Sequence, residues 1–357
     1  MIDNTKFTFF KNKKVLITGH TGFKGSWLTK ILLLCGAKVC GYSLKAPTKP
    51  NLYGLSNVDS SIESVIADIR DFKTLKVTFE SFKPEIVIHL AAQPLVRESY
   101  QNPRFTYETN VLGTLNVLEC VRLCESVKSF LNVTTDKVYL NKDKENYRFK
   151  EEDPLDGYDP YSNSKSCSEL ITHSYQRSFF QDGRCAISTA RAGNVIGGGD
   201  FSENRIIPDC IRAVTNGDPI IVRNPHSIRP YQHVLEPLFA YLTILAEQYE
   251  RVSLQGSYNI GPDDCDCITT GKLVSVFCEK WKNGATWVNK SNCGPHEAKF
   301  LKLDNSKIKN TFQWKPIWNI DKTVDKVCRW TKIFLKCPDD VPNEMECEII
   351  DFLGDLQ

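Results

Sequence analysis

Two side chains one helical turn apart have the right types to move a proton together. Tyr161 and Lys165 lie in a segment that begins at Pro160 and contains no helix breaker before Gly183, which predicts a helix. Residues four apart share a helix face, so the phenol and the ammonium would be neighbours. A free phenol has a pKa of about 10, and a nearby cation lowers that pKa. The pair would then accept a proton from an alcohol while a hydride leaves its carbon. Because this spacing is also common on exposed helices, the surrounding elements must support it.

A glycine-rich loop near the start of the chain predicts a dinucleotide-binding site. A short apolar strand over 13–18 runs into the sequence TGHTGFKG, and a buried-helix pattern follows. Gly19, Gly22 and Gly25 allow a tight turn and a close approach of a pyrophosphate, and the helix N-terminus offers free N–H groups to its oxygens. The spacing is GxxGxxG rather than GxGxxG, and an ordinary strand-to-helix turn is the alternative interpretation.

The next two predicted strands end at groups that would meet the adenosine half of such a cofactor. Where an acidic residue for the ribose is expected, the sequence has Ser43 and Lys45, so the choice between NAD and NADP stays open. Asp68 and Ile69 end the third strand and are candidate adenine contacts, with a helix cap as the alternative role for Asp68. The candidate cofactor contacts are Gly19, Thr21, Gly22, Phe23, Gly25, Asp68, Ile69, Ala91, Ala92, Tyr161 and Lys165.

Strands and helices alternate along the first half of the chain, which predicts an α/β fold with a doubly wound parallel sheet of the Rossmann type. Ligands of such sheets bind beyond the carboxyl ends of the strands, and Thr135, Asp136 and Lys137 fall at such an end. Thr135 would hydrogen-bond a substrate hydroxyl and direct it toward Tyr161, and Lys165 would hold the nicotinamide ribose. These residues predict oxidation of a secondary alcohol on a nicotinamide cofactor.

The last third of the chain has weak periodicity and predicts a smaller, mixed substrate-binding lobe with helices around 267–283 and 321–336. The acidic sequence after residue 337 is typical of a peripheral tail. The expected division is 1–188 plus about 232–255 for the dinucleotide-binding domain, and 189–231 plus 256–357 for the substrate lobe.

Composition excludes several other classes of protein. The chain has 357 residues, 41% hydrophobic and 25% charged, and a formal net charge of +2, which is unlike a nucleic-acid-binding protein. We expect no secretory signal, no membrane span and no partner membrane. Its 14 cysteines are scattered without a paired CxxC motif, so we expect reduced thiols in a cytoplasmic protein and no metal site.

Five motifs, TGHTGFKG, HLAAQ, TTDKVY, YSNSK and RAGNVIGGGD, resemble the extended short-chain dehydrogenase/reductase family of NAD-dependent epimerases and dehydratases, over roughly residues 10–330. The later motifs RIIPDCIRA, RPYQHVLEPL and PHEAKFLKLD are more specific, and they resemble the branch of that family that dehydrates CDP-glucose. The resemblance implies NAD in the first lobe, a nucleotide sugar between the lobes, and a place in 3,6-dideoxyhexose synthesis for a bacterial lipopolysaccharide O-antigen.

The resemblance also implies roles for the acid and the base. Tyr161 takes the proton from O4 of the sugar while C4 gives up a hydride, and the resulting ketone acidifies the hydrogen on C5. Lys137 is then the base at C5 and Asp136 the acid at O6, in place of the Asp-Glu pair of many relatives. The stored hydride finally returns to C6. Lys137 must therefore lose its proton, which burial and the nearby Lys165 would favour, and Asp136 must carry one. We expect no salt bridge between the two, because adjacent side chains on an extended segment diverge, and a solvated loop pair is the alternative.

The substrate lobe carries side chains suited to a diphosphate. The planar fork of an arginine can bond two phosphate oxygens, although each of these arginines could instead form a surface ion pair. Two departures from the family pattern, Tyr231 in place of a tryptophan and Lys299 in place of a smaller polar residue, leave the recognised base less certain. The candidate substrate contacts are Asn194 and Arg205, followed by Arg229 and His233.

Three other functions remain open at this point. A nucleotide-sugar 4-epimerase shares Thr135, Tyr161 and Lys165 but needs no acid–base pair such as Asp136 and Lys137. A dehydratase of a GDP- or dTDP-linked sugar is a nearer alternative. A non-catalytic dinucleotide sensor would tolerate loss of the tyrosine or the lysine, and both are present. The resemblance further implies a homodimer or homotetramer built through helices near 103–125 and 161–181.

Overall fold

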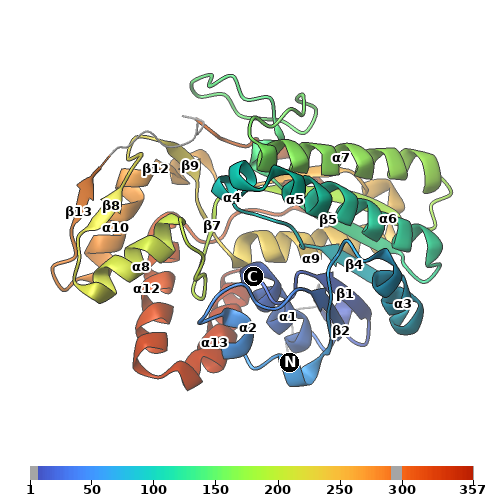
Figure 1. Ribbon diagram of the computed structural model, residues 1–357, viewed down its shortest axis with the longest axis horizontal. Helices are drawn as coiled ribbons and strands as arrows, with labels where there is room; N and C mark the ends of the chain where they lie inside the picture. The colour runs from blue at the N-terminus through green and yellow to red at the C-terminus, as the bar shows by residue number, and fades with distance from the viewer. Residues whose placement is uncertain (1–6, 291–299, 357) are drawn as a thin grey trace.

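A seven-stranded parallel sheet forms the centre of the computed structural model, which describes residues 7–290 and 300–356 (Figure 1). The strands run in the order β11-β6-β5-β4-β1-β2-β3, and each neighbouring pair is parallel. The predicted Rossmann-type sheet is therefore confirmed. Its strands are β1 (Lys14–Thr18), β2 (Lys38–Ser43), β3 (Glu63–Ile66), β4 (Ile86–His89), β5 (Ser129–Thr135), β6 (Ala186–Ala192) and β11 (Ser257–Ile260).

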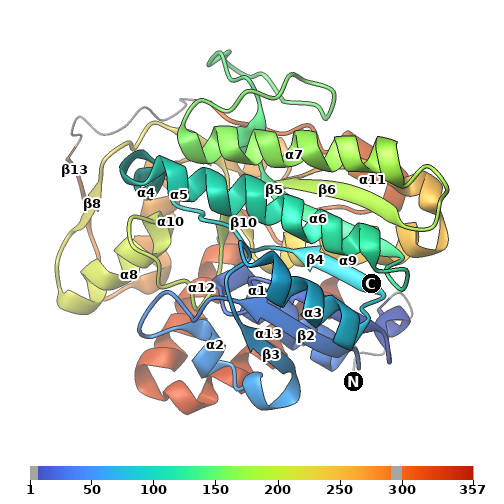
Figure 2. The same cartoon turned by 45° about the vertical axis from the view of Figure 1, so that its right-hand side comes forward.

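Helices cover both faces of this sheet (Figure 2). One apolar cluster joins α1, α9 and α13 to one face, and a second joins α3, α6 and α7 to the other. Six of the seven strands are buried over most of their length, as parallel strands between two helical layers must be. These helices are α1 (Phe23–Leu34), α9 (Leu235–Glu250), α13 (Val341–Asp355), α3 (Phe72–Phe82), α6 (Gly113–Leu123) and α7 (Pro160–Phe179).

The strand order reverses between β1 and β4, which are neighbours in the sheet although two other strands separate them in sequence. The chain leaves β1 toward one flank and β4 toward the other. The connections beyond their carboxyl ends diverge here and leave a crevice, where ligands of open α/β sheets bind. The glycine-rich loop follows β1, and Ala91 and Ala92 follow β4.

The expectation of a peripheral tail after residue 337 is wrong. Residues 341–355 form α13, which packs against α1, and Met345, Ile349 and Phe352 are fully buried in the main core. The acidic side chains of this segment misled the prediction, because they alternate with an apolar stripe at helical spacing.

A second, smaller lobe has an apolar core of its own, formed by residues of α8, β8, α10 and α12. One strand and the end of another that were assigned to this lobe by sequence lie elsewhere, since residues 257–260 form β11 and residues 189–192 end β6 of the central sheet. With those boundaries moved, we retain the division into two lobes as a proposal. The elements of the lobe are α8 (Ile206–Asn216), β8 (Ile220–Val222), β9 (Ile228–Pro230), β12 (Cys267–Thr269), α10 (Thr270–Trp281), β13 (Trp287–Asn289) and α12 (Ile320–Lys336).

Short elements connect these layers. A π-helical turn over 108–112 leads into α6. No helix in the part of the chain that the structure describes is long and apolar enough to cross a membrane. The remaining elements are α2 (Leu52–Leu55), α4 (Val96–Gln101), α5 (Pro103–Tyr107), β7 (Val195–Ile196), β10 (Gln232–His233) and α11 (Ser306–Phe312).

Candidate active site

The predicted helix that carries the tyrosine and the lysine is confirmed as α7. It begins at Pro160, and the Asp159 carboxylate accepts a hydrogen bond from the Ser162 N–H at 3.0 Å, which caps the helix. The cap fixes the first turn, and Tyr161 lies in that turn. Lys165 follows one turn later, and its ammonium is buried, with 3% of the residue exposed. Its Nζ donates to the Val133 carbonyl oxygen at 2.9 Å.

The expected lowering of the tyrosine pKa by Lys165 is not what the structure gives. Burial raises the pKa of the Tyr161 phenol to about 12, and a hydrogen bond with Thr135 and the positive charge of Arg205 oppose that rise. Desolvation disfavours the phenolate more than the neighbouring charges favour it. Thr135 and Tyr161 are nevertheless brought together, as the sequence predicts. The phenol is therefore neutral at neutral pH.

Asp136 and Lys137 form the ion pair that sequence reasoning ruled out. Lys137 Nζ lies 3.4 Å from Asp136 Oδ1. Residues 136–138 form a 3-10 turn rather than an extended segment, so adjacent side chains can converge. The Thr135 hydroxyl also donates to Asp136 Oδ1, at 3.0 Å. The carboxylate is fully buried, whereas the lysine side chain is 31% exposed, so burial acts on the lysine less than expected.

Two buried oxygen atoms at this place have no hydrogen-bond partner among the described residues. They are Asp136 Oδ2 and Asn194 Oδ1. Asp136 Oδ2 lies against Gly193, where an added Cβ would come within 3.3 Å of it. Buried acceptors are almost always satisfied, so both oxygens are available to accept hydrogen bonds from a water or a ligand. Asn194, which was predicted to contact the substrate, directly follows Gly193 in the chain.

The glycine-rich loop fits the diphosphate of a dinucleotide. Gly22 is the N-cap of α1, no side chain caps the helix, and its first turn holds no acidic residue. The free N–H groups there suit an anion. A Cβ on Gly25 would lie 2.1 Å from the Gly19 carbonyl oxygen, so this close turn requires glycine. Thr21 Oγ1 donates to the Leu44 carbonyl oxygen at 2.8 Å and ties the loop to the end of β2.

The two candidate adenine contacts lie on opposite sides of the chain after β3. The Asp68 carboxylate accepts hydrogen bonds from Arg70, including the backbone N–H at 2.8 Å and Nη2 at 2.8 Å. The helix cap considered for Asp68 is wrong, because Asp71 caps α3 through the Thr74 N–H. Ile69 is buried beneath α6. Asp68 is the member of the pair that also lines an open hollow of about 550 Å³.

Lys24 is a site residue that sequence reasoning missed. Burial and the positive charges of Arg205 and Lys165 together lower the pKa of its ammonium to about 7. Its Nζ lies 3.5 Å from the Tyr241 hydroxyl. The field of Asp136 also acts on Lys24, which places its ammonium among the predicted catalytic and substrate-binding charges. Its position inside a glycine motif hid it, because the motif is explained by the backbone alone.

The remaining candidate substrate contacts separate in the structure. Arg205 precedes α8, is 34% exposed and pairs with Asp200 at 3.0 Å. Arg229 lies in β9 with 7% of its surface exposed. His233 is fully buried, and its Nε2 lies 2.7 Å from Glu348 Oε1 of α13. The prediction that His233 binds the substrate is therefore wrong, because a helix that the sequence analysis took for a tail covers it. Lys299 lies outside the described residues.

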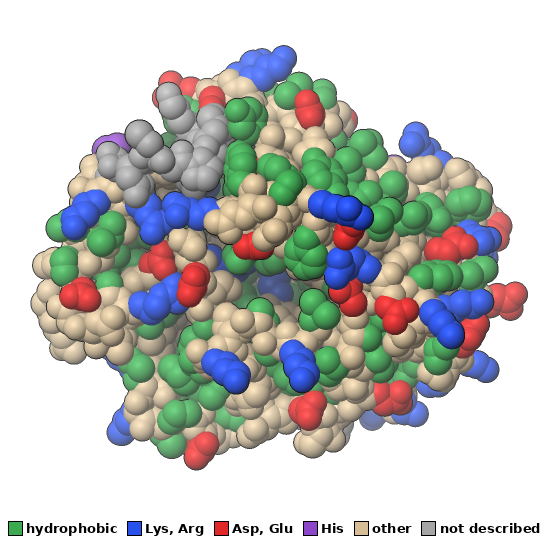
Figure 3. Space-filling view, viewed as in Figure 1, with side chains coloured by type: hydrophobic (Ala, Val, Ile, Leu, Met, Phe, Trp, Pro, Cys, Tyr) green, Lys and Arg blue, Asp and Glu red, His purple; other side chains and the backbone are tan. Residues whose placement is uncertain are grey.

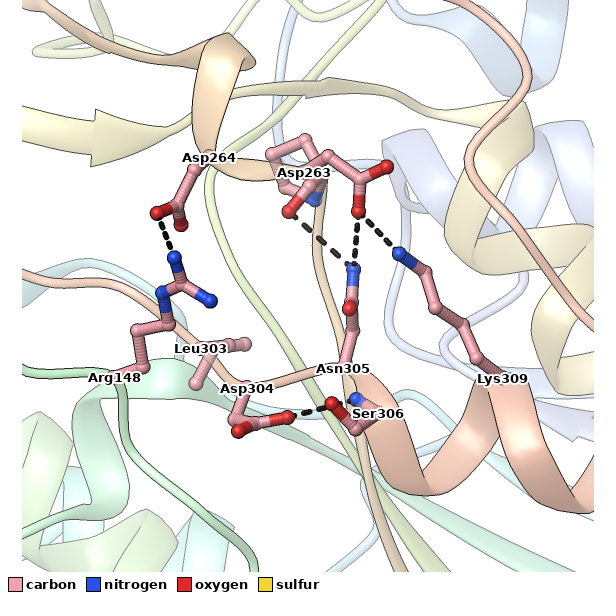
Figure 4. Close-up of a pocket in the computed structure, with 9 residues that line it drawn as sticks. Arg148, Asp263, Asp264, Leu303, Asp304, Asn305, Ser306 and Lys309 are labelled. Atoms are coloured by element: carbon pink, nitrogen blue, oxygen red, sulfur yellow. Dashed lines mark hydrogen bonds and ion pairs between the residues drawn. The ribbon is translucent and has the colours of Figure 1, made fainter.

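The surface of the molecule in the view of Figure 1 is hollowed near its centre, and a basic side chain is visible at the bottom of this hollow (Figure 3). A separate cavity of about 300 Å³ lies between the loop after β11 and the start of α11 (Figure 4). Its charged side chains satisfy one another, with Arg148 paired to Asp264 and Lys309 to Asp263. None of the predicted catalytic or cofactor-binding residues lines it, so it is not the catalytic centre.

Comparison with known proteins matches residues 16–327 to the family model described as GDP-mannose 4,6 dehydratase. The chain is 44% identical over 345 residues to the CDP-glucose 4,6-dehydratase of Salmonella typhimurium, covering 95% of each chain. It is 29% identical over 333 residues to a probable dTDP-glucose 4,6-dehydratase of Sinorhizobium fredii, covering 89% of this chain and 92% of that one.

Among solved structures, the fold is similar to the UDP-glucose 4-epimerase of Thermus thermophilus, determined as a complex with NAD. The TM-score is 0.78 at 25% identity, and the match covers 89% of this chain and 99% of the epimerase. Epimerases and dehydratases thus share this fold, and the residues around the catalytic helix must tell them apart.

Proposed function

This chain belongs to the GDP-mannose 4,6 dehydratase family, and we propose that it is an NAD-dependent CDP-glucose 4,6-dehydratase. The reaction converts CDP-glucose into CDP-4-dehydro-6-deoxyglucose with loss of one water. The similarity to the Salmonella typhimurium enzyme over 95% of both chains supports the substrate. The observation that carries the reaction type is the contact between Lys137 and the buried Asp136, beside the Thr135–Tyr161 hydrogen bond.

The first step is oxidation at C4 of the hexose. We propose that Thr135 orients the O4 hydroxyl and that Tyr161 Oη receives its proton. NAD would be held by the glycine loop and would supply the hydride acceptor. Lys165 follows Tyr161 by one turn of α7, and its ammonium would hold the hydroxyl groups of the nicotinamide ribose.

The elimination needs a neutral amine and a protonated carboxyl group. A proton that passes from Lys137 Nζ to Asp136 Oδ1 across their 3.4 Å contact produces both at once, with no change in total charge. Lys137 then takes the C5 proton, the C6–O bond breaks, and Asp136 gives its proton to the departing hydroxyl. The elimination leaves a C5=C6 double bond and returns the two groups to the ion pair from which they began. C6 then regains the hydride that was taken from C4, and Lys137 gives a proton to C5. Lys137 recovers a proton from solvent as Tyr161 releases the O4 proton to solvent, so each turnover restores the acid and the base. The unpartnered Asp136 Oδ2 leaves one carboxyl oxygen available to the sugar.

The proposed function is tested by incubating the protein with a panel of nucleotide sugars and determining the mass of each product and its configuration at C4. The protein with NAD should convert CDP-glucose to a product one water lighter, measured by mass spectrometry, and should leave UDP-glucose, dTDP-glucose and GDP-mannose largely unchanged. Turnover of a GDP- or dTDP-linked sugar with no reaction of CDP-glucose would contradict the proposed substrate. A product of unchanged mass with inverted C4 would instead identify an epimerase.

Assembly and location belong to the proposal as well. We propose a homodimer through α6 and α7, or a homotetramer built from it, because large apolar side chains are exposed on and beside these helices. Sedimentation velocity tests this, and a monomer at micromolar concentration would contradict it. We further propose that the protein acts in the cytoplasm, where nucleotide sugars are made. The exposed apolar residues are Leu112, Leu123, Leu170 and Phe179.

A further inference from the structure

A buried ionic network lies directly behind the catalytic helix. Glu169 and Arg191 are fully buried, and Arg191 Nη2 donates to Glu169 Oε2 at 2.9 Å. The Thr189 hydroxyl donates to the same oxygen at 2.7 Å, and the Thr134 hydroxyl donates to Oε1. His173 Nε2 lies 3.4 Å from Oε2. Four groups converge on one carboxylate that takes no part in the chemistry proposed above.

The members of this network are close neighbours of catalytic residues. Glu169 follows Lys165 by one turn of α7, and Thr134 immediately precedes Thr135 in β5. The carboxylate therefore bonds the helix that carries the tyrosine and the lysine to the strand that carries the threonine. A shift of α7 along the sheet would break at least one of these bonds.

The other end of Arg191 reaches the segment after the acid–base pair. Its Nη1 donates to the Tyr139 hydroxyl at 2.8 Å and to the Glu151 carbonyl oxygen at 2.9 Å. The Tyr139 hydroxyl in turn donates to Asn259 Oδ1 at 2.6 Å. Tyr139 is only two residues beyond Lys137, so one arginine links the catalytic helix to the turn that holds the acid and the base.

The Glu169 carboxylate also interacts electrostatically with the catalytic Lys165. Burial lowers the pKa of Lys165 to about 8, and the negative charge of Glu169 opposes that lowering. Lys24 on α1 is a cation that faces the same ammonium. His89 on β4 also faces it, and burial lowers the pKa of that ring to about 3, so the ring is neutral. The Val133 carbonyl on β5 accepts its hydrogen bond. Among the described residues, Glu169 is the charged group that favours the ammonium form.

We propose that Glu169 is a positioning residue of this active site: its carboxylate, held by Arg191, is the counter-charge that keeps Lys165 an ammonium ion one helical turn away. The inference rests on the proposed function, because it concerns the lysine of the same site. A purely mechanical brace is the competing explanation. It would make variants unstable and slow without changing the pH at which Lys165 loses its proton.

Two single variants should move that pH in opposite directions. Glu169→Gln removes the negative charge and leaves the Arg191 cation, so the alkaline limb of the kcat profile, measured at saturating CDP-glucose, should move down by about one pH unit or more. Arg191→Met leaves a carboxylate that still has the Thr134 and Thr189 hydroxyls, so the limb should move up. The double variant removes both charges and should lie between the singles. It remains testable where a single variant fails to fold, because neither member of the Glu169–Arg191 pair is left buried without the other.

The affinity for NAD gives a readout that does not depend on turnover. Quenching of tryptophan fluorescence by NAD across pH 6–10 should weaken at a lower pH in Glu169→Gln than in the wild type. Glu348→Gln, which removes an equally buried carboxylate on α13, should leave both profiles unchanged. Profiles of Glu169→Gln and wild type that coincide, or shifts of the same sign in both single variants, would overturn the inference. A wild-type protein that binds NAD but ignores CDP-glucose would overturn the proposed function instead, and the NAD profiles would still test Glu169.

Discussion

At the scale of single residues, spacing in the sequence predicts which side chains are in contact only if both belong to the same helix or strand. Tyr161 and Lys165 lie on one helix, and their relation follows from the helical repeat. The Asp136–Lys137 contact was missed because its geometry depends on a 3-10 turn. Glu169 and Arg191 are 22 residues apart in sequence and meet only because α7 packs on β6. The pKa of Tyr161 was misjudged because its burial is a property of the whole fold.

Lys137→Ala separates the two halves of the proposed reaction. The variant keeps Thr135 and Tyr161, so one equivalent of CDP-glucose should still reduce the bound cofactor, seen as a rise in absorbance of the reduced form. Water loss should fall by about 10²-fold or more, because the C5 base is missing. A variant that retains full dehydratase turnover would show that Lys137 is not the base.

Lys24→Met tests the cation that faces Arg205. A hydrogen bond to a charged group contributes about 1.5–3 kcal/mol, so the KM for CDP-glucose should rise about tenfold or more, with kcat changed less. The pKa of Lys24 is lowered to about 7, so the wild-type KM should rise as the pH increases above 7, and the variant should lose this dependence. Lys30→Met, on the same helix but paired with Glu346 at the surface, is the matched control. Equal KM values for Lys24→Met and wild type at pH 6.5 would remove Lys24 from the site.

At the scale of elements, the parallel sheet and most helices were predictable because each follows from its own hydrophobic pattern. The elements that failed depend on partners far away in sequence. α13 carries many acidic residues, and its burial is visible only once α1 and α9 offer an apolar surface. His233 was misassigned for the same reason, since Glu348 of α13 is its partner.

Phe352→Ala measures whether α13 is part of the core. Its ring stacks on Phe239 with centroids 5.0 Å apart and meets Trp318 edge-on. Removing a buried phenylalanine costs about 3–5 kcal/mol of unfolding free energy. Ile350→Ala on the same helix is the control, because Ile350 is 55% exposed and a surface change costs no more than about 0.5 kcal/mol. Equal denaturant midpoints for the two variants would mean that the helix is not docked.

At the scale of the whole molecule, stability should depend on a carboxyl group far from the chemistry. Glu236 at the start of α9 accepts the N–H groups of Ile317 and Trp318 at 2.9 and 2.6 Å, and so joins the central sheet to the segment before α12. Burial raises its pKa to about 8. In the folded protein the Glu236 carboxyl therefore keeps its proton at neutral pH. In the unfolded chain the same carboxyl loses its proton near the ordinary pKa of Glu, about 4.3.

This difference predicts that stability falls as the pH rises. Between the unfolded and folded pKa values the folded state binds more protons, so the free energy of unfolding decreases by up to about 1.4 kcal/mol per pH unit. Relative to Glu236→Gln, which cannot titrate, the wild type should lose about 2 kcal/mol between pH 6 and pH 8. Urea unfolding of both proteins at several pH values measures the difference. If the free energies of unfolding of the wild type and Glu236→Gln change in parallel from pH 5 to pH 9, Glu236 is ionised in the folded protein.

The central claim is that one active site takes a hydride from C4 of the hexose and returns it to C6 after water has left. CDP-glucose that carries deuterium at C4 tests this in a single incubation in ordinary water, with the product examined by NMR. We predict that the deuterium appears at C6 of the product. Deuterium that remains at C4, or that is lost to the solvent, would contradict the account.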